Sequence, residues 1–291
     1  MKFVFMNGIV IVDKPQEWTS QDVTARLRRV FNTRRIGHGG TLDPMATGVL
    51  PVFVGRATRG VEFFEHAEKT YETVLRLGLT TDTEDVWGET REEREVAFSE
   101  ETLEQVLTSF RGEILQVPPM YSALKVNGQK LCDLARKGRE VERKPRPITI
   151  HELTLLERGE NTLRLRVKCS KGTYIRTLCK DIGEALGCGG CMQALRRVTA
   201  GEYTIEEAVP LQVLLETQDP ESYLRGVDTM FRNLPEVKLT ANQEKRCRNG
   251  NAFTMNLAEG TYRAYSQTGE FLMLAKVEGG VMSTVKSFFD V

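Results

Sequence analysis

The segment from Gly37 to Val52, GHGGTLDPMATGVLPV, restricts the folding of this chain more than any other. It places four glycines and two prolines around a single carboxylate, Asp43. Glycine adopts backbone conformations that are closed to other residues, and proline fixes its own φ and restrains the residue before it. The segment therefore predicts a sharply turned loop, with more turn-forming residues than an ordinary turn needs.

Two interpretations of Asp43 follow from its surroundings. An aspartate before a proline is commonly only a turn residue. Here the nearby glycines would also let a ligand approach the backbone closely, and His38 and Thr41 supply hydrogen-bonding groups beside the carboxylate. These features favour a carboxylate that is presented rigidly at an open surface.

The sequence limits the chemistry that such a carboxylate could do. No second carboxylate stands at an evident partner position, which weakens a glycosidase interpretation. Serine nucleophile elbows, phosphate-binding loops and dinucleotide fingerprints are absent from the sequence. A lone aspartate can act as nucleophile or base if a cation keeps it ionised. The best candidate is Arg176, one turn into a predicted helix, although an arginine on the surface of that helix is the alternative.

Charge is distributed unevenly along the 291 residues, whose formal net charge is zero. Residues 120–200 contain 17 Lys/Arg and 8 Asp/Glu, whereas residues 82–105 contain 2 basic and 10 acidic residues. One basic face can bind phosphate backbones even in a neutral protein. Solvated helix surfaces explain the same pattern equally well.

Composition and cysteine spacing indicate a globular protein of the cytoplasm. The hydrophobic fraction of 40% and the charged fraction of 27% are ordinary, and no apolar run reaches the eighteen residues that would indicate a membrane span. The N-terminal residues alternate like a strand rather than a signal peptide. Six scattered cysteines with one close pair, Cys188 and Cys191, favour reduced thiols over a metal or redox site.

Apolar periodicity and capping residues predict the main elements. We expect strands at 7–14, 49–54, 69–79 and 161–170, with Pro51 indicating an edge or a bulge. Helices are expected after the caps Thr19 and Ser99 and after Gly172, and residues 32–48 are expected to be loop. Residues 118–147, basic and bounded by prolines, look like an excursion from the core. After about residue 234, short strands around the turn QTGE predict a small β domain.

Several segments, in order along the chain, resemble the motifs of pseudouridine synthases of the bacterial TruB type. HGGTLDPMATGVLPV is similar to the catalytic motif of that family, and IVDKPQEWTSQDV to its first motif. KTYETVLRLGLTTDTEDVWG, VPPMYSALKVNGQKL, SKGTYIRTLCKDIGEALG and ALRRVTAG are similar to its later motifs. The resemblance covers nearly the whole chain.

The resemblance implies a role for each matching residue. Asp43 would be the catalytic aspartate, Arg176 would pair with it, and Tyr71 would stack on the target uracil and help steer the proton lost from C5. Leu195 and Tyr174 would line the uracil pocket, and His38 would hold the flipped nucleotide. Lys14 with Pro15 would buttress the site, and Asp85 would face the substrate. Lys125 and Lys130 would clasp the RNA.

The resemblance also implies the architecture and the activity. The expected fold is α+β, with a central mixed, largely antiparallel sheet flanked by helices and loops. Residues 1–233 would form the catalytic domain, including the basic RNA-clasping insertion at about 118–147, and residues 234–291 a PUA-like RNA-binding domain. The expected reaction is isomerisation of uridine-55 in the T-arm of tRNA by a cytoplasmic monomer that needs no cofactor, metal, membrane or protein partner.

Two other functions are compatible with parts of the sequence. A non-catalytic RNA-binding or tRNA-folding protein could keep the same scaffold, but it would not need Asp43, Tyr71 and Arg176 together. A hydrolase built on Asp43 ranks third because its second carboxylate is missing.

Overall fold

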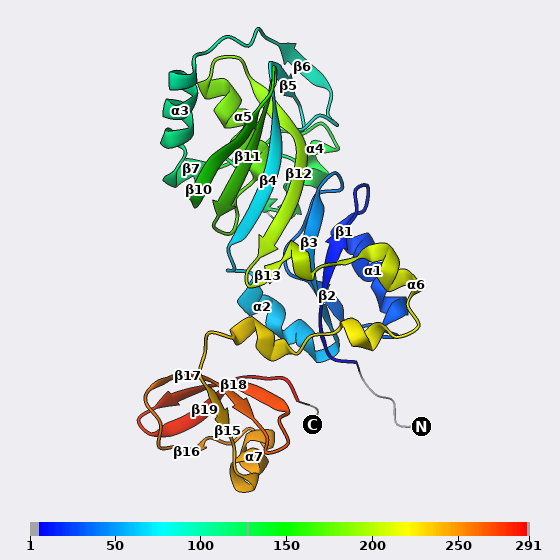
Figure 1. The fold of residues 1–291 in the computed structure, drawn as a ribbon, viewed down its shortest axis with the longest axis vertical. Helices are drawn as coiled ribbons and strands as arrows, with labels where there is room; N and C mark the ends of the chain where they lie inside the picture. The colour runs from blue at the N-terminus through cyan, green and yellow to red at the C-terminus, as the bar shows by residue number, and fades with distance from the viewer. Residues whose placement is uncertain (1–5, 127, 290–291) are drawn as a thin grey trace. The chain divides into compact units, whose positions relative to one another are not determined.

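The computed structural model describes residues 6–126 and 128–289, and these form an α+β fold (Figure 1). They divide into two compact units. The first holds residues 6–44, 50–65 and 201–289, and the second holds residues 45–49 and 66–200. Strand β3 (Thr47–Val54) begins in the second unit and continues in the first.

The second unit is built on a largely antiparallel sheet with the strand order β12-β4-β11-β10-β7, and the start of β3 pairs with β12 in parallel. Two short hairpins, β5–β6 and β8–β9, lie outside this sheet. The elements are β4 (Lys69–Leu77), β5 (Leu79–Thr81), β6 (Thr90–Glu93), α3 (Glu100–Ser109), β7 (Gly112–Gln116), β8 (Lys125–Val126), β9 (Gln129–Lys130), α4 (Leu131–Ala135), β10 (Arg146–Arg158), β11 (Thr162–Cys169), α5 (Ile175–Ala185) and β12 (Gly190–Ala200).

Alternation along β11 explains how the second unit forms its core. Leu163, Leu165, Val167 and Cys169 are fully buried, while the residues between them carry charge. The predicted helix after Gly172 is confirmed as α5, and it is followed by Gly187 at φ +81°, a conformation that favours glycine. Ser99 caps α3 as predicted.

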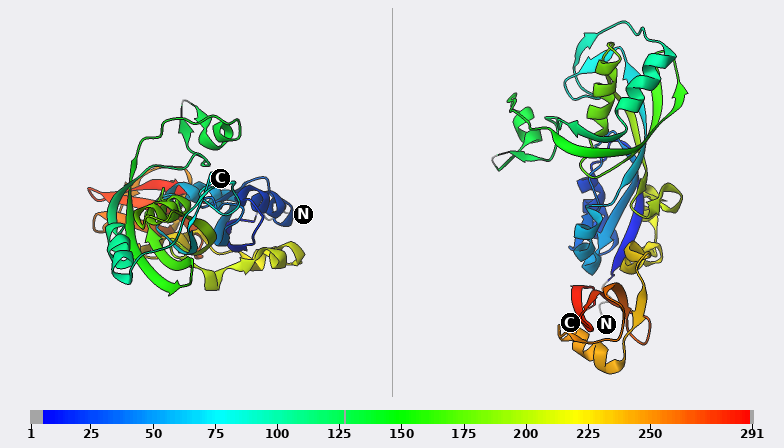
Figure 2. Two further views of the ribbon diagram at one scale, coloured as in Figure 1. Left: turned by 90° about the horizontal axis from the view of Figure 1, so that it is seen from above. Right: turned by 90° about the vertical axis from the view of Figure 1, so that its left-hand side faces the viewer.

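The predicted excursion from the core is visible in the second unit. The chain leaves the sheet after β7 and returns at β10, and between them lie the β8–β9 hairpin and α4 (Figure 2). Residue 127, between β8 and β9 in the sequence, lies outside the described residues.

The first unit begins with the predicted strand and capped helix. Its elements are β1 (Gly8–Lys14), α1 (Ser20–Val30), β2 (Ile36–His38), η1 (Gly55–Gly60), α2 (Val61–Phe64), β13 (Tyr203–Thr204), η2 (Ile205–Glu207), β14 (Val209–Pro210), α6 (Leu211–Glu216), η3 (Pro220–Tyr223), η4 (Val227–Phe231), β15 (Glu236–Lys238), α7 (Ala241–Arg248), β16 (Phe253–Thr254), β17 (Gly260–Tyr265), β18 (Phe271–Glu278) and β19 (Val281–Ser287). Thr19 caps α1 in a reciprocal capping box with Asp22.

Two expectations about the region around β3 were wrong. Residues 32–48 are not all loop, because β2 forms a three-residue strand against β3, and three residues are too few to show a periodicity. Of the two alternatives for Pro51, the edge strand is wrong, because β3 lies inside the sheet order, and the bulge stays a prediction. Pro51 stands between the residues that pair with β12 (Thr47, Gly48) and those that pair with β2 (Val52–Val54), so its missing N–H falls where the partner changes.

The last part of the first unit is a five-stranded sheet in the order β15-β17-β18-β19-β16. Its buried cluster includes Leu239, Tyr262, Leu272 and Met282, and the predicted hairpin around QTGE is confirmed as β17–β18. The domain boundary at residue 234 stays a prediction. No helix within the described residues is long and apolar enough to cross a bilayer.

Candidate active site

The loop around Asp43 is fixed on both sides of the carboxylate. On one side, the Leu42 N–H donates to Ser20 Oγ at 2.9 Å, and this hydroxyl donates to the Leu42 carbonyl at 3.2 Å. On the other side, the Pro44 carbonyl accepts a hydrogen bond from the Glu17 N–H at 2.8 Å. Asp43 itself is half-buried. Both neighbours of Asp43 are thus held by backbone contacts that do not depend on its side chain.

Lys14 supports the same loop from the end of β1. Its side chain is fully buried, and Nζ donates to the carbonyls of Trp18 at 2.6 Å, Pro15 at 2.9 Å and Pro44 at 3.3 Å. A buried ammonium needs such partners to offset the loss of hydration. These contacts buttress the loop, while a direct contact between Lys14 and a substrate stays a prediction.

Two glycines of the loop have structural reasons to be glycine. A Cβ atom on Gly39 would lie 2.4 Å from the Phe64 ring, and Gly40 adopts φ +100°. His38, at the end of β2, is half-buried and its Nε2 lies 3.5 Å from the Gln21 amide of α1. The first unit therefore brings Lys14, His38 and the Asp43 loop together around the start of α1.

Tyr71 and Leu195 lie on one face of the sheet in the second unit. Tyr71 is opposite Arg197 across β4 and β12, and Leu195 is opposite Thr73. Residues that face each other across an antiparallel pair share a face, as do residues two apart on a strand. Tyr71 is 9% exposed and Leu195 8%, so both predicted pocket residues present a small accessible surface on this face.

Helix α5 lies over the same face and carries Arg176 there. Thr73 Oγ1 is 3.7 Å from Cys179 Sγ of α5, and Arg176, three residues before Cys179, lies on the same side of the helix. The second unit therefore places Tyr71, Leu195 and Arg176 on one side of its sheet.

Arg176 is a buried guanidinium rather than a surface arginine. It is the second residue of α5, earlier in the helix than predicted, and is 5% exposed. Nη1 donates to the Thr83 carbonyl at 3.1 Å and Nη2 to the Tyr121 carbonyl at 2.8 Å, while Nε lies 3.9 Å from Asp85 Oδ2. Several fixed acceptors hold the planar fork in one orientation.

Asp85 lies in a tight turn beside Arg176. It is 8% exposed, and its Oδ1 accepts hydrogen bonds from Thr83 Oγ1 at 2.8 Å and from the Trp87 N–H at 3.0 Å. The Thr81 hydroxyl donates to its carbonyl at 2.6 Å. These contacts of Asp85 lie within the second unit, and its predicted contact with a substrate stays a prediction.

The remaining predicted residues of the second unit lie at the start of α5 and on the β8–β9 hairpin. Tyr174 is the N-cap residue of α5, and its backbone N–H and carbonyl bond the Gln116 side chain at 2.9 and 3.1 Å. Lys125 and Lys130 are exposed and face each other across the β8–β9 hairpin. Like charges in this arrangement repel, and the predicted role of these lysines in RNA binding stays a prediction.

Sequence reasoning missed two groups of buried charge in the second unit. Arg197 is 1% exposed, and its Nε donates to the Val49 carbonyl at 2.7 Å. Adjacent residues on a strand point to opposite faces of the sheet, so one of Arg196 and Arg197 had to point to the face that carries the core. This pair was the sequence signal for a buried arginine. Glu84, also buried, had no comparable signal in the sequence.

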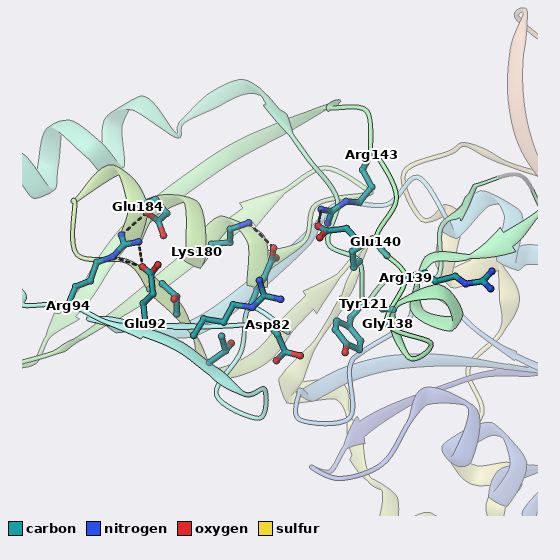
Figure 3. A pocket seen from close by; sticks show the side chains of 17 residues that line it. Asp82, Glu92, Arg94, Tyr121, Gly138, Arg139, Glu140, Arg143, Lys180 and Glu184 are labelled. Carbon is teal, nitrogen blue, oxygen red and sulfur yellow. Dashed lines mark hydrogen bonds and ion pairs between the residues drawn. The ribbon is translucent and has the colours of Figure 1, made fainter.

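A cavity of about 460 Å³ lies beside the cluster in the second unit (Figure 3). It is strongly charged, and its lining includes Tyr121, Glu84, Lys180, Arg94 and Glu184. Residues with opposite charges pair across its wall, so it has no excess of one sign that would identify a ligand.

The six cysteines are free thiols, as predicted. Burial raises the pKa of Cys179 to about 12 and that of Cys191 to about 11. Thiolates are the reactive form of cysteine, so these buried side chains pack as small apolar groups.

Sequence comparisons show which proteins this chain is similar to. The family described as TruB family pseudouridylate synthase (N terminal domain) matches residues 28–175, and the tRNA pseudouridylate synthase B C-terminal domain matches residues 176–227. A Ralstonia pickettii protein named tRNA pseudouridine synthase B is 43% identical, covering 95% of this chain and 92% of its own length. Proteins with the same name from Francisella philomiragia and Clostridium kluyveri are 42% and 39% identical, covering 98% and 97% of this chain and 95% and 100% of their own lengths.

Solved structures share the fold. A chain of a Cbf5-Nop10-Gar1 complex is 26% identical and superimposes with a TM-score of 0.74, covering 98% of this chain and 86% of that one. A chain of an H/ACA RNP bound to a substrate RNA containing 2′-deoxyuridine is 23% identical, with the same TM-score and coverage. With family matches that span residues 28–227 and relatives above 40% identity over nearly the full length, the chain belongs to the TruB family of pseudouridylate synthases, a family of isomerases.

Proposed function

We propose that this chain isomerises uridine-55 in the T-arm loop of tRNA to pseudouridine. The observation that carries the proposal is the identity of 43% and 42%, over nearly the full length, to proteins named tRNA pseudouridine synthase B. The rigid mounting of the Asp43 loop and the buried Arg176 support it, because a protein that only binds RNA needs neither.

The proposed reaction moves one bond within the nucleotide. The N1–C1′ glycosidic bond breaks, the uracil rotates, a C5–C1′ bond forms, and the proton on C5 is lost while N1 gains one. Asp43 is the carboxylate on which this exchange depends, Arg176 is its proposed ion-pair partner, and Tyr71 stacks on the uracil. Because atoms and electrons balance within the substrate and water, the reaction requires no cofactor.

The target base has to leave its stack before it can react. Unstacking costs a few kcal/mol, and stacking on an aromatic ring such as Tyr71 returns about 1–3 kcal/mol. Leu195 supplies an apolar wall, Tyr174 a second wall, and His38, Lys14 and Asp85 are proposed to hold the nucleotide. A small apolar pocket would keep the freed uracil beside the ribose until the new bond forms.

The RNA is proposed to bind across the basic insertion at about 118–147, through Lys125 and Lys130 among others. The repulsion between these two lysines across the hairpin would be relieved by a phosphate between them. Residues 234–291 are proposed as a PUA-like domain that adds affinity for the duplex part of tRNA. We propose that the enzyme acts in the cytoplasm as a monomer, without a protein partner.

Release of tritium from a tRNA transcript labelled at uridine C5 tests the proposed function directly. The proton on C5 is lost only if the new carbon bond forms, so tritium should appear in water in proportion to pseudouridine. Changing uridine-55 alone to cytidine should abolish release. Tight binding without any release of tritium would instead support the RNA-binding or tRNA-folding protein.

Two variants of Tyr71 separate stacking from the hydroxyl group. Tyr71→Phe keeps the ring and should lose much of the tritium release while binding RNA normally. Tyr71→Leu should be slower still, because the loss of stacking removes about 1–3 kcal/mol. Equal rates near wild type for both variants would remove Tyr71 from the active site.

RNA binding should depend on salt chiefly through the insertion. Neutralising Lys125, Lys130, Arg136 and Lys137 together should flatten the slope of log K against log salt by up to about four units, because each lost phosphate contact contributes about 0.9. A matched control neutralises Arg76, Arg164, Arg166 and Lys168, which alternate with the buried residues of β4 and β11 and so point to the opposite face of the sheet from Tyr71. A slope altered by the control set but not by the first would place the RNA on the other face.

A further inference from the structure

Glu84 is a buried carboxylate for which the proposed reaction has no direct use. It is 8% exposed and lies in the turn between β5 and β6, one residue before Asp85. Its Oε2 accepts a hydrogen bond from Thr177 Oγ1 at 2.6 Å, and its Oε1 accepts one from Lys180 Nζ at 3.0 Å. Both donors belong to α5, and Thr177 directly follows Arg176 in the chain.

The backbone of Glu84 is attached to a different element. The Met192 N–H of β12 donates to the Glu84 carbonyl at 3.0 Å, and the Val86 N–H donates to the Met192 carbonyl at 3.0 Å. The turn around Glu84 is thus docked on β12 through its main chain and on α5 through one carboxylate.

Glu84 also adopts an unfavourable backbone conformation. Its φ is +65°, a value that costs a residue with a side chain about 1–2 kcal/mol. Non-glycine residues keep such conformations where surrounding contacts hold them, and these positions concentrate at functional sites. Glycine would relieve this strain, so the presence of glutamate indicates that the carboxylate has a role in this turn.

The neighbours of Glu84 hold the Arg176 guanidinium. The Thr83 carbonyl, one residue earlier, accepts from Arg176 Nη1, and the Asp85 carboxylate, one residue later, lies 3.9 Å from Arg176 Nε. A shift of the turn relative to α5 would therefore move two groups that orient the guanidinium.

We propose that Glu84 is a positioning residue: its carboxylate fastens the first turn of α5, which carries Arg176, to the turn that carries Thr83 and Asp85. The inference rests on the proposed role of Arg176 in catalysis. Glu84 does not contact the reacting atoms; it sets the distance between Arg176 and its acceptors. Lys180 is 43% exposed at its side chain, so the buried Thr177 hydroxyl is the more rigid of the two attachments.

The test uses Glu84→Gly, because glycine is relaxed at φ +65° and keeps the turn while deleting the carboxylate. The single-turnover rate of pseudouridine formation in a T-arm stem-loop should fall by about 10- to 100-fold, as expected when a catalytic group is displaced by a fraction of an ångström to 1 Å. The Kd for the RNA should stay within about twofold, and thermal unfolding should show a folded protein. Glu84→Gln, which keeps one acceptor oxygen, should restore part of the rate.

A matched control separates this effect from a general loss of charge. Glu184→Gln removes a carboxylate from the same helix, where it pairs with Arg94 at 2.8 Å (Figure 3). Its rate should match wild type. Thr177→Val should also slow the reaction, and the double variant should be no slower than Glu84→Gly alone, because Glu84→Gly already removes the acceptor of the Thr177 hydroxyl.

Other results would overturn either the positioning role of Glu84 or the proposed function. A wild-type rate for Glu84→Gly, or additive losses in the double variant, would overturn the positioning role while the proposed function stood. A loss confined to RNA affinity or to thermal stability would overturn it as well. Failure of the wild-type enzyme and of Glu184→Gln to form pseudouridine would reject the proposed function, and the inference with it.

Discussion

Asp43→Asn is expected to reduce pseudouridine formation by at least about 10³-fold, since the loss of a catalytic carboxylate removes acid–base or nucleophilic chemistry that nothing else supplies. The fold should persist, because Leu42 and Pro44 are held by backbone contacts on both sides. Binding of tRNA should change by no more than a few-fold, because phosphate contacts dominate affinity. Tritium release and a binding titration on the same preparation measure both quantities.

The chain contains its own control for this substitution. Asp219 also precedes a proline, Pro220, but it is exposed and lies at the start of a short 3₁₀ helix. Asp219→Asn should leave the rate and the affinity unchanged. A normal rate for Asp43→Asn, or equal losses in the two variants, would show that Asp43 is only a turn residue.

Arg176→Lys should be the second most damaging change, with a loss of about 100-fold in the single-turnover rate. The lysine keeps the positive charge, but a single ammonium cannot reproduce the planar fork that reaches the Thr83 and Tyr121 carbonyls at once. One carbonyl would then remain unpaired in a buried site, which costs about 1–3 kcal/mol of folding free energy. Rates and thermal unfolding measured together separate the catalytic loss from the structural one.

Arg94→Lys provides the comparison for Arg176→Lys. Arg94 pairs with Glu92 and Glu184 on the rim of the charged cavity, and its side chain is 36% exposed (Figure 3). Exposed ion pairs contribute only about 0–1 kcal/mol, so this variant should keep the wild-type rate. If Arg176→Lys were as active as Arg94→Lys, the charge alone would suffice and the orientation of the guanidinium would have no role.

The Asp43 and Arg176 variants test two residues that the sequence indicates for different reasons. Asp43 was singled out by the glycines and prolines around it, which are local signals. Arg176 was singled out only as a cation available to the carboxylate, with a surface arginine as the alternative. Its burial and its carbonyl acceptors remove that alternative, while its pairing with Asp43 stays a proposal.

The sequence by itself determined the features that depend on near neighbours in the chain. Thr19 and Ser99 begin their helices because a side-chain oxygen can reach an N–H three residues ahead. The alternation in β11 and the turn between β17 and β18 were predictable because side chains on a strand repeat every two residues. The Asp43 loop belongs to this group, since glycine and proline act on the backbone directly.

Only the tertiary structure decided the features that depend on distant partners. The three-residue strand β2 exists because β3 offers it hydrogen bonds, and Pro51 is tolerated inside a sheet because the partner of β3 changes there. Arg176 and Glu84 are buried charges that sequence patterns assign to the surface, and the structure decides that Arg197 is the buried member of the pair Arg196 and Arg197. They become stable inside only where carbonyls, hydroxyls or opposite charges from other segments satisfy them, and those partners are brought close by folding rather than by proximity in the chain.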